Sequence, residues 1–276
     1  KQFAHGVTVH HRDELDQVQR DMRLWQGVSA IVYDQMCATE RRRQRKRGLV
    51  PDPELRAIIN PDVCEGCGDC SDASNCLSIV PTETEFGRKR RIDQSSCNKD
   101  FSCLDGFCPS FVTVEGGALK ISAPPVVDSA NPAAGLPEPT PVNIDGSYNI
   151  LLTGIGGTGV ITVGAGLGMA AHIEGKGCAV LDQTGLAQKN GAVMSHVSIS
   201  NDPDTVMATR IGTAMSDLVI GFDMVVAAGQ AAINTMSATR TRAVINDHLV
   251  PLAAFAERPD MPLEAGGYTN VIETAL

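Results

Sequence analysis

The sequence has little of what several classes of protein need. Aromatic residues make up 4% of the 276 residues, with one tryptophan, which leaves few side chains for stacking on bases. The formal net charge is −9, so we expect no nucleic-acid partner. No run of about 18 apolar residues occurs, so we also expect no membrane span. No apolar stretch follows the first charged residues, as it would in a secretory signal, and we expect a cytoplasmic protein.

Cysteine, by contrast, is plentiful and unevenly placed. The chain has nine cysteines, and seven of them fall between Cys64 and Cys108. The other two, Cys37 and Cys178, lie in apolar or strand-end contexts and are expected to be small core residues. A disulfide scaffold would be small, secreted and rich in loops, whereas a long cysteine-poor segment follows here. This distribution favours ligation of a metal or redox cofactor.

The first group of cysteines predicts an iron–sulfur cluster. Cys64, Cys67 and Cys70 form a C-x2-C-x2-C run, whose two-residue gaps let successive thiolates converge on one face of a cluster. In two-cluster ferredoxins the fourth ligand comes from the other half of the chain and precedes a proline, as Cys108 precedes Pro109. We therefore predict a [4Fe–4S] cluster on these four cysteines. The alternative is a zinc-stabilised interaction module.

The second group is irregular. Its candidate ligands are Cys76, Cys97 and Cys103, and Asp100 stands where a middle cysteine would be expected. A carboxylate oxygen matches iron in a cluster less well than a thiolate does. We predict either a [3Fe–4S] cluster or a [4Fe–4S] cluster with one iron bound by Asp100. The other interpretation is that Asp100 is a surface residue and another group fills its position.

The C-terminal half reads as an α/β domain. A strand over 149–153 leads into Gly154, Gly156, Gly157 and Gly159, a G-x-G-x-x-G pattern followed by a helical run over 160–173. Such a loop can hold a phosphate or nucleotide at the start of the helix, or its glycines can simply permit a tight turn. Further strands are expected at 178–181, 218–222 and 242–245. The fold class is α/β, a Rossmann-like, mostly parallel sheet preceded by a small ferredoxin-like iron–sulfur module.

An NAD(P)-linked iron–sulfur oxidoreductase module is the competing hypothesis. Asp182 would then accept a hydrogen bond from a ribose hydroxyl, but it lies 28 positions after Gly154 rather than about 20. The stretch over 183–191 is polar and loop-like, where a dinucleotide fold would continue. His196 has no ligand pattern around it and is expected to be a core or surface residue.

Four segments follow one another along the chain. Residues 1–50 hold an expected strand, helix and strand (5–11, 12–26 and 27–33), which cannot bury a core alone and indicate the C-terminal edge of a domain. The chain is therefore expected to be a piece of a longer protein. Residues 51–122 form the cysteine module, 123–147 a proline-rich linker, and 148–276 an α/β domain expected to be incomplete.

Two basic runs lie close to the cysteines in the sequence, one before them and one among them. Residues 41–47 contain six basic side chains in seven positions, and residues 88–91 form a second run. Each run is either a solvated segment or a docking surface for an acidic electron-transfer partner.

The combined order of segments resembles the thiamine-diphosphate-dependent 2-oxoacid:ferredoxin oxidoreductases, most closely the long single-chain indolepyruvate type. Residues 5–40 resemble the end of that family's thiamine-diphosphate domain. Residues 59–117, with VCEGCGDC and CPSFVTVEGG, resemble its ferredoxin-type segment. Residues 149–276 resemble its gamma domain, with GIGGTGV, the QKNG loop over 188–191 and the strand MSHVSIS.

The resemblance implies oxidative decarboxylation of an aryl pyruvate such as indole-3-pyruvate. The acyl product would leave on coenzyme A, and the electrons would pass through two iron–sulfur clusters to ferredoxin. Because the chain has no G-D-G motif, thiamine diphosphate and Mg²⁺ are expected on the remaining domains of the same polypeptide, and no catalytic residue is expected here. The resemblance also implies a homo-oligomer.

Overall fold

The computed structural model describes residues 3–117, 136–185, 190–206, 208–252, 255, 258 and 261–276. The chain divides into two compact units, Lys1–Asp52 and Pro53–Leu276. Much of the predicted linker over 123–147 lies outside the described residues, as do Gln188 and Lys189 of the QKNG loop.

The first unit is helical. It contains η1 (Arg12–Glu14), α1 (Leu15–Leu24) and α2 (Ala38–Lys46), and no residue of these three elements is buried. The predicted helix over 12–26 is confirmed, whereas neither 5–11 nor 27–33 forms a strand. A strand is stable only when a neighbour takes up its backbone hydrogen bonds, and the described part of this unit contains no other strand.

The second unit begins with a module built from two antiparallel strand pairs. β1 (Arg56–Ile59) pairs with β4 (Phe111–Val114), and β2 (Ile79–Thr84) pairs with β3 (Gly87–Ile92). The short helix α3 (Asp69–Ser74) lies between β1 and β2, and η2 (Ser102–Leu104) lies between β3 and β4. Its buried core consists of Ala57, Ile59, Cys64, Ile79 and Ile92, and Cys70, Cys76, Cys97 and Cys103 pack against it.

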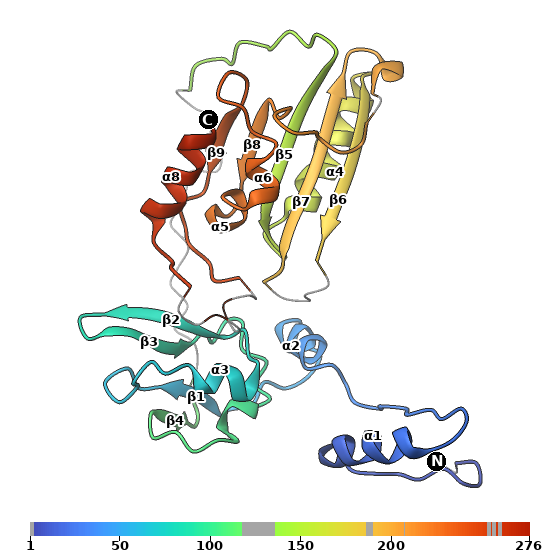
Figure 1. Cartoon of the computed structure of the whole chain (residues 1–276), viewed down its shortest axis with the longest axis vertical. Coiled ribbons are helices and arrows are strands. Elements are labelled where there is room, and N and C mark those ends of the chain that lie inside the picture. Colours follow the sequence, from blue (N-terminus) through green and yellow to red (C-terminus); the bar gives the residue numbers. More distant parts are fainter. Residues whose placement is uncertain are drawn as a thin grey trace. The chain divides into compact units, whose positions relative to one another are not determined.

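A five-stranded mixed sheet forms the centre of the α/β domain (Figure 1). The strands lie in the order β6-β7-β5-β8-β9, with bounds Gly177–Thr184, Ala192–Ser200, Ser147–Ile155, Leu218–Gly221 and Arg242–Ile245. β8 runs parallel to β5 and to β9, but β7 runs antiparallel to both β5 and β6. All predicted strands of this domain are present. The prediction of a mostly parallel sheet is wrong, because β7 is antiparallel to both of its neighbours.

The direction of β7 follows from the length of the connection before it. β6 ends at Thr184 and β7 begins at Ala192, so only residues 185–191 join two neighbouring strands. A parallel neighbour would need a crossover of a dozen or more residues, whereas an antiparallel neighbour needs only a short loop.

Helices cover both faces of this sheet (Figure 1). Ile150 and Leu152 of β5 face α4 (Val160–Ile173), with Val160 in the same cluster. The intervening Leu151 packs on the opposite face with Ala232 of α6 (Gln230–Ile233) and with Leu276, which follows α8 (Ala265–Ala275). The alternation of side chains along a strand thus supplies two apolar cores from one strand. The helical run predicted over 160–173 is confirmed.

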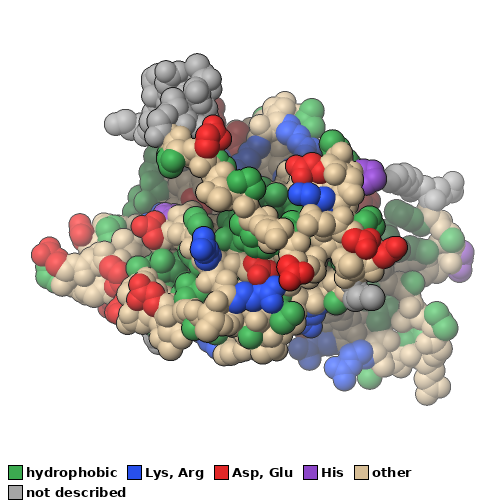
Figure 2. All heavy atoms as spheres, turned by 90° about the horizontal axis from the view of Figure 1, so that it is seen from above, with side chains coloured by type: hydrophobic (Ala, Val, Ile, Leu, Met, Phe, Trp, Pro, Cys, Tyr) green, Lys and Arg blue, Asp and Glu red, His purple; other side chains and the backbone are tan. Residues whose placement is uncertain are grey.

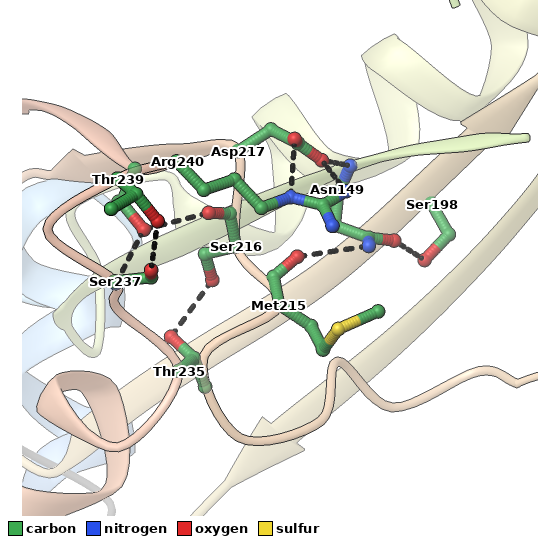
Figure 3. Close-up of polar contacts among 10 residues, drawn as sticks. Asn149, Ser198, Met215, Ser216, Asp217, Thr235, Ser237, Thr239 and Arg240 are labelled. Carbon is green, nitrogen blue, oxygen red and sulfur yellow. Dashed lines mark hydrogen bonds and ion pairs between the residues drawn. The ribbon is translucent and has the colours of Figure 1, made fainter. Parts of the chain in front are cut away.

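A polar network ties the start of β5 to the segment before β8 (Figure 3). The Asn149 side chain donates to the Met215 carbonyl at 2.9 Å and accepts from the Ser198 hydroxyl at 2.8 Å. The Asp217 carboxylate accepts from the Asn149 backbone amide at 2.8 Å, and from Nε and Nη2 of Arg240 at 2.6 and 2.9 Å. The network fixes where β8 enters the sheet beside β5.

The surface carries charges of both signs. On the face drawn in Figure 2, acidic and basic side chains are interspersed with apolar ones. Among the described residues, no helix has the length and apolar character that crossing a membrane requires.

Candidate functional site

The two cysteine loops of the module begin with the same backbone turn. The amide of Cys64 donates to the Asn60 carbonyl, and the amide of Cys97 donates to the Asp93 carbonyl, both at 3.0 Å. The Asn60 and Asp93 side chains each accept a further bond, also at 3.0 Å, from the amide two residues ahead. The halves of the module therefore repeat with an offset of 33 residues (97 − 64).

The repeat fixes which residues correspond. With the offset of 33, Cys70 corresponds to Cys103 and Cys67 corresponds to Asp100. The loops also close alike, because the Cys76 and Cys108 carbonyls each accept an amide from three residues ahead, at 3.2 Å in both halves. Asp100 thus occupies in the second loop the position that Cys67 occupies in the first.

The thiols gather in two groups. Burial raises the pKa of the Cys70 thiol, and the neighbouring charges of Cys64, Cys67 and Cys108 raise it further. The pKa of Cys103 is likewise raised, to about 12. Burial is the largest cause, and the neighbouring charges of Cys76, Cys97 and Asp100 raise the pKa further. Such mutual influence requires proximity, so the structure brings together the members of each predicted ligand set.

The chemistry of these groups suits a metal cluster. A buried thiol crowded by other thiols holds its proton at neutral pH, unless a metal takes the place of the proton. Among the described residues, however, no group of three or more His, Cys, Asp or Glu side chains is arranged so that it could hold a metal ion. The donor sets fit the predicted clusters in the type of their side chains, and their ligand roles stay predictions.

The first loop is pressed against β3. Gly66 has φ +78°, and a Cβ there would overlap the backbone carbonyl of Arg88. Gly68, with φ +91°, is the N-cap of α3, two residues before Cys70. Both positions favour glycine because other residues rarely adopt a left-handed backbone. Cys67 and Cys108 lie on the exposed side of the group, whereas Cys64 is buried.

The second loop has a strained backbone on both sides of Asp100. Lys99 and Phe101 have φ angles of 52° and 60°, and the Lys99 amide donates to the Cys97 sulfur at 3.3 Å. The exposed Asp100 accepts at Oδ1 from the amide and the hydroxyl of Ser102, at 3.3 and 3.1 Å. These bonds to Ser102 are what a surface turn would also make, so both interpretations of Asp100 stand.

The glycine-rich loop joins β5 to α4. A Cβ at Gly154 would lie 2.7 to 3.0 Å from Thr158, Val160 and Phe222, so close packing requires this glycine. Gly157 and Gly159 have φ angles of 101° and 94° with open space beside them. Gly154 therefore serves packing, whereas the other two serve the turn and leave their surface free.

An open cavity of about 370 Å³ lies over this loop. It is lined by Gly156, Gly157 and Gly159, by the hydroxyl residues Thr162 and Thr184, and by Gly191. The Gly156 amide donates to the Gly191 carbonyl at 2.8 Å, which places Gly191 against the GIGGTGV motif. The pattern of glycines did not indicate Thr184, which reaches the cavity from the end of β6.

Asp182 is poorly placed for the role that an NAD(P) site would give it. It lies on β6, where it pairs with Ser195 of β7, and β7 separates β6 from β5. In a dinucleotide fold the acidic residue ends the strand next to the glycine loop. The parallel neighbour of β5 is instead β8, which is followed by Asp223, a buried side chain whose Oδ1 accepts from the Val226 amide at 2.9 Å.

The two basic runs differ in exposure. Within 41–47, most of which forms α2, Arg41, Arg43 and Lys46 are exposed. Arg90, in the second run, is 2% exposed, so its side chain belongs neither to a solvated segment nor to a docking surface. Buried arginines occur where neighbouring groups compensate the charge.

The α/β domain matches a known family. Residues 149–264 match the model of the pyruvate ferredoxin/flavodoxin oxidoreductase family. Indolepyruvate oxidoreductase subunit IorB from Pyrococcus horikoshii and its counterpart from Thermococcus kodakarensis are each 32% identical to the chain over 78 residues. That stretch covers 28% of this chain and 37% of each relative, so the chain spans little more than a third of the curated relatives it matches.

Two solved structures resemble part of the chain. Pyruvate oxidoreductase subunit PORC from Thermotoga maritima has a TM-score of 0.30 and 16% identity, covering 41% of this chain and 56% of that one. The gamma subunit of a keto/oxoacid ferredoxin oxidoreductase from Geobacter sulfurreducens has a TM-score of 0.27 and 17% identity, covering 46% of this chain and 98% of that one.

Proposed function

The chain belongs to the 2-oxoacid:ferredoxin oxidoreductase family, and from this membership we propose that it forms the electron-transfer module and the gamma domain of such an enzyme. The observation that carries the proposal is the gathering of seven cysteines into two groups in an internally repeated module. The substrate would be an aryl pyruvate such as indole-3-pyruvate, a choice supported by the names of the IorB relatives.

The proposed ligand sets follow the two groups. Cys64, Cys67, Cys70 and Cys108 would hold a [4Fe–4S] cluster, and the ferredoxin-like module would span 51–122. Cys76, Cys97, Cys103 and Asp100 would hold a [3Fe–4S] cluster or a [4Fe–4S] cluster with one Asp-bound iron. Bound clusters would supply storage and transfer of single electrons.

The protein's own contribution is to set the surroundings of each ligand set. The buried Cys64 and the isoleucines of the module core would keep water from the inner side of the first set. The exposed Cys67 and Cys108 would leave its outer side accessible to a redox partner. The exposed basic side chains of α2 would attract an acidic ferredoxin through weak, steered contacts.

The other cofactors would be bound outside the cysteine module. Thiamine diphosphate and Mg²⁺ would be bound by other domains of the polypeptide, with residues 1–50 as the edge of one of them. The gamma domain over 148–276, after the linker at 123–147, would dock against those domains. The cavity over Gly156, Gly157 and Gly159 would hold a phosphate of coenzyme A at the start of α4. The assembly would be a cytoplasmic homo-oligomer.

Reduction of ferredoxin by the complete enzyme tests the proposal. The enzyme containing this chain is assayed with indole-3-pyruvate, coenzyme A and oxidised ferredoxin. We expect Cys70→Ser and Cys103→Ser each to reduce the rate of ferredoxin reduction to background, because each removes a ligand of one set. Cys178→Ser, which changes a cysteine of the gamma domain outside both groups, is the matched control and should leave the rate unchanged. Unchanged rates in the first two variants would contradict the proposal.

A further inference from the structure

Arg90 is a buried cation in the strand that supports the first cysteine loop. It lies on β3 and is 2% exposed, and Arg88 points to the same face because side chains alternate along a strand. The backbone carbonyl of Arg88 is the atom that a Cβ at Gly66 would overlap. The loop between Cys64 and Cys67 therefore rests on β3 within two residues of Arg90.

Residues of the gamma domain contact the same two arginines. The guanidinium carbons of Arg88 and Arg90 lie 5.8 and 6.0 Å from the centroid of the Phe255 ring, which is itself 5% exposed. Arg88 Nη1 also donates to the Met261 carbonyl at 2.8 Å. At these distances the ring face attracts a guanidinium, and more strongly when water is excluded.

Arg90 therefore places a buried positive charge on the strand that the loop of Cys64 and Cys67 contacts.

We infer that Arg90 is a positioning residue that sets the reduction potential of the cluster on Cys64, Cys67, Cys70 and Cys108, and that Phe255 of the gamma domain holds its guanidinium in place. This inference rests on the proposed function. A cluster gains one negative charge when it takes up an electron, and a buried positive charge stabilises that reduced state with little screening by water. The gamma domain thereby influences the potential of a cluster to which it contributes no ligand.

A reductive titration of the protein, followed by electron paramagnetic resonance, tests this inference. Arg90→Gln should make reduction of one cluster about tenfold less favourable, which is 59 mV for a one-electron couple, and leave the other cluster unchanged. Arg91→Gln is the matched control: it removes the same charge from the next, exposed position of β3 and should shift neither potential.

Two conservative variants keep the test decisive if Arg90→Gln takes up no cluster. Arg90→Lys keeps the charge and should stay close to the wild-type potential. Phe255→Leu keeps an apolar side chain but removes the ring face, and should lower the potential of the same cluster by less than Arg90→Gln.

The outcomes separate the inference from the proposed function. If Arg90→Gln shifts the reduction potentials of both clusters equally, the role of Arg90 is overturned. The same holds if neither Arg90→Gln nor Phe255→Leu shifts a potential while the iron content stays at the wild-type level. A wild-type protein without iron–sulfur signals would instead overturn the proposed function.

Discussion

Asp100 is held between two residues in left-handed conformations, Lys99 and Phe101. Each of these costs roughly 1–2 kcal/mol relative to an ordinary conformation, and such costs persist where the surrounding structure imposes them. The second loop therefore presents a carboxylate at the place where the first loop presents Cys67, at a cost in backbone strain.

A reciprocal exchange at this position tests the role of Asp100. Asp100→Cys should complete a second set of four thiolates and convert the second cluster to an ordinary [4Fe–4S] type, because sulfur binds the fourth iron more firmly than oxygen does. Cys67→Asp should give the first cluster the labile iron of the second. Iron content and electron paramagnetic resonance of both variants are the measurements. Identical spectra for Asp100→Cys and the wild type would show that Asp100 is a surface residue.

The buried His196 makes stability depend on pH. It is 2% exposed, and its Nδ1 accepts the Ile211 amide at 3.3 Å. Burial, followed by the charge of Arg210, lowers its pKa in the folded protein. The unfolded chain therefore binds a proton first, near pH 6.5, and stability that is complete above this pH is lost as the pH falls below it.

Replacing His196 should remove this pH dependence. Between pH 7 and 5.5 we expect the opening free energy of the β7 amides to fall by up to about 1.4 kcal/mol per pH unit in the wild type, and less in His196→Gln. Native-state hydrogen exchange, corrected for its intrinsic pH dependence, measures this quantity. His172→Gln, on the exposed side of α4, is the control. An equal slope in wild type and His196→Gln would refute the account.

Among the elements, those of the α/β domain follow from local sequence. The apolar strand 149–153, the glycines after it and the helical run over 160–173 predict β5 and α4, because each signal lies within a few residues. The direction of β7 was predictable too, since residues 185–191 are too few for a crossover, but the Rossmann-like pattern of the glycines favoured a parallel sheet.

Contacts between distant segments could not be predicted in this way. Phe255 lies 165 positions after Arg90, and no local pattern relates an aromatic residue near the end of the chain to a basic strand (255 − 90 = 165). The strands expected at 5–11 and 27–33 fail for a related reason. Their alternation of apolar residues is a local signal, but a strand also needs a partner that the local sequence does not specify.

Two glycines of one loop should respond differently to the same substitution. Gly154→Ala places a Cβ within 3.0 Å of Thr158, Val160 and Phe222, and overpacking of this kind costs about 1–3 kcal/mol. Gly156→Ala meets neighbours only at 3.7 and 3.9 Å, which are ordinary contacts. Thermal unfolding of the two variants gives the comparison. Equal stability of both would show that the packing at Gly154 is looser than described.

For the whole molecule, the balance between cysteines and conventional core is the decisive feature. The module over 53–117 has few buried aliphatic side chains, and cysteines surround them. The α/β domain has two apolar clusters of its own on the faces of its sheet. Because metal binding and folding are coupled where ligands complete a small core, the module is expected to depend on its clusters, whereas the α/β domain is not.

The iron and sulfide content of the anaerobically purified protein, determined together with its electron paramagnetic resonance, tests whether the chain binds two iron–sulfur clusters. Two clusters per chain predict a brown protein with about 7 or 8 iron atoms and a similar amount of sulfide, with distinct signals from the two sites. A colourless protein with zinc and no acid-labile sulfide would contradict the claim.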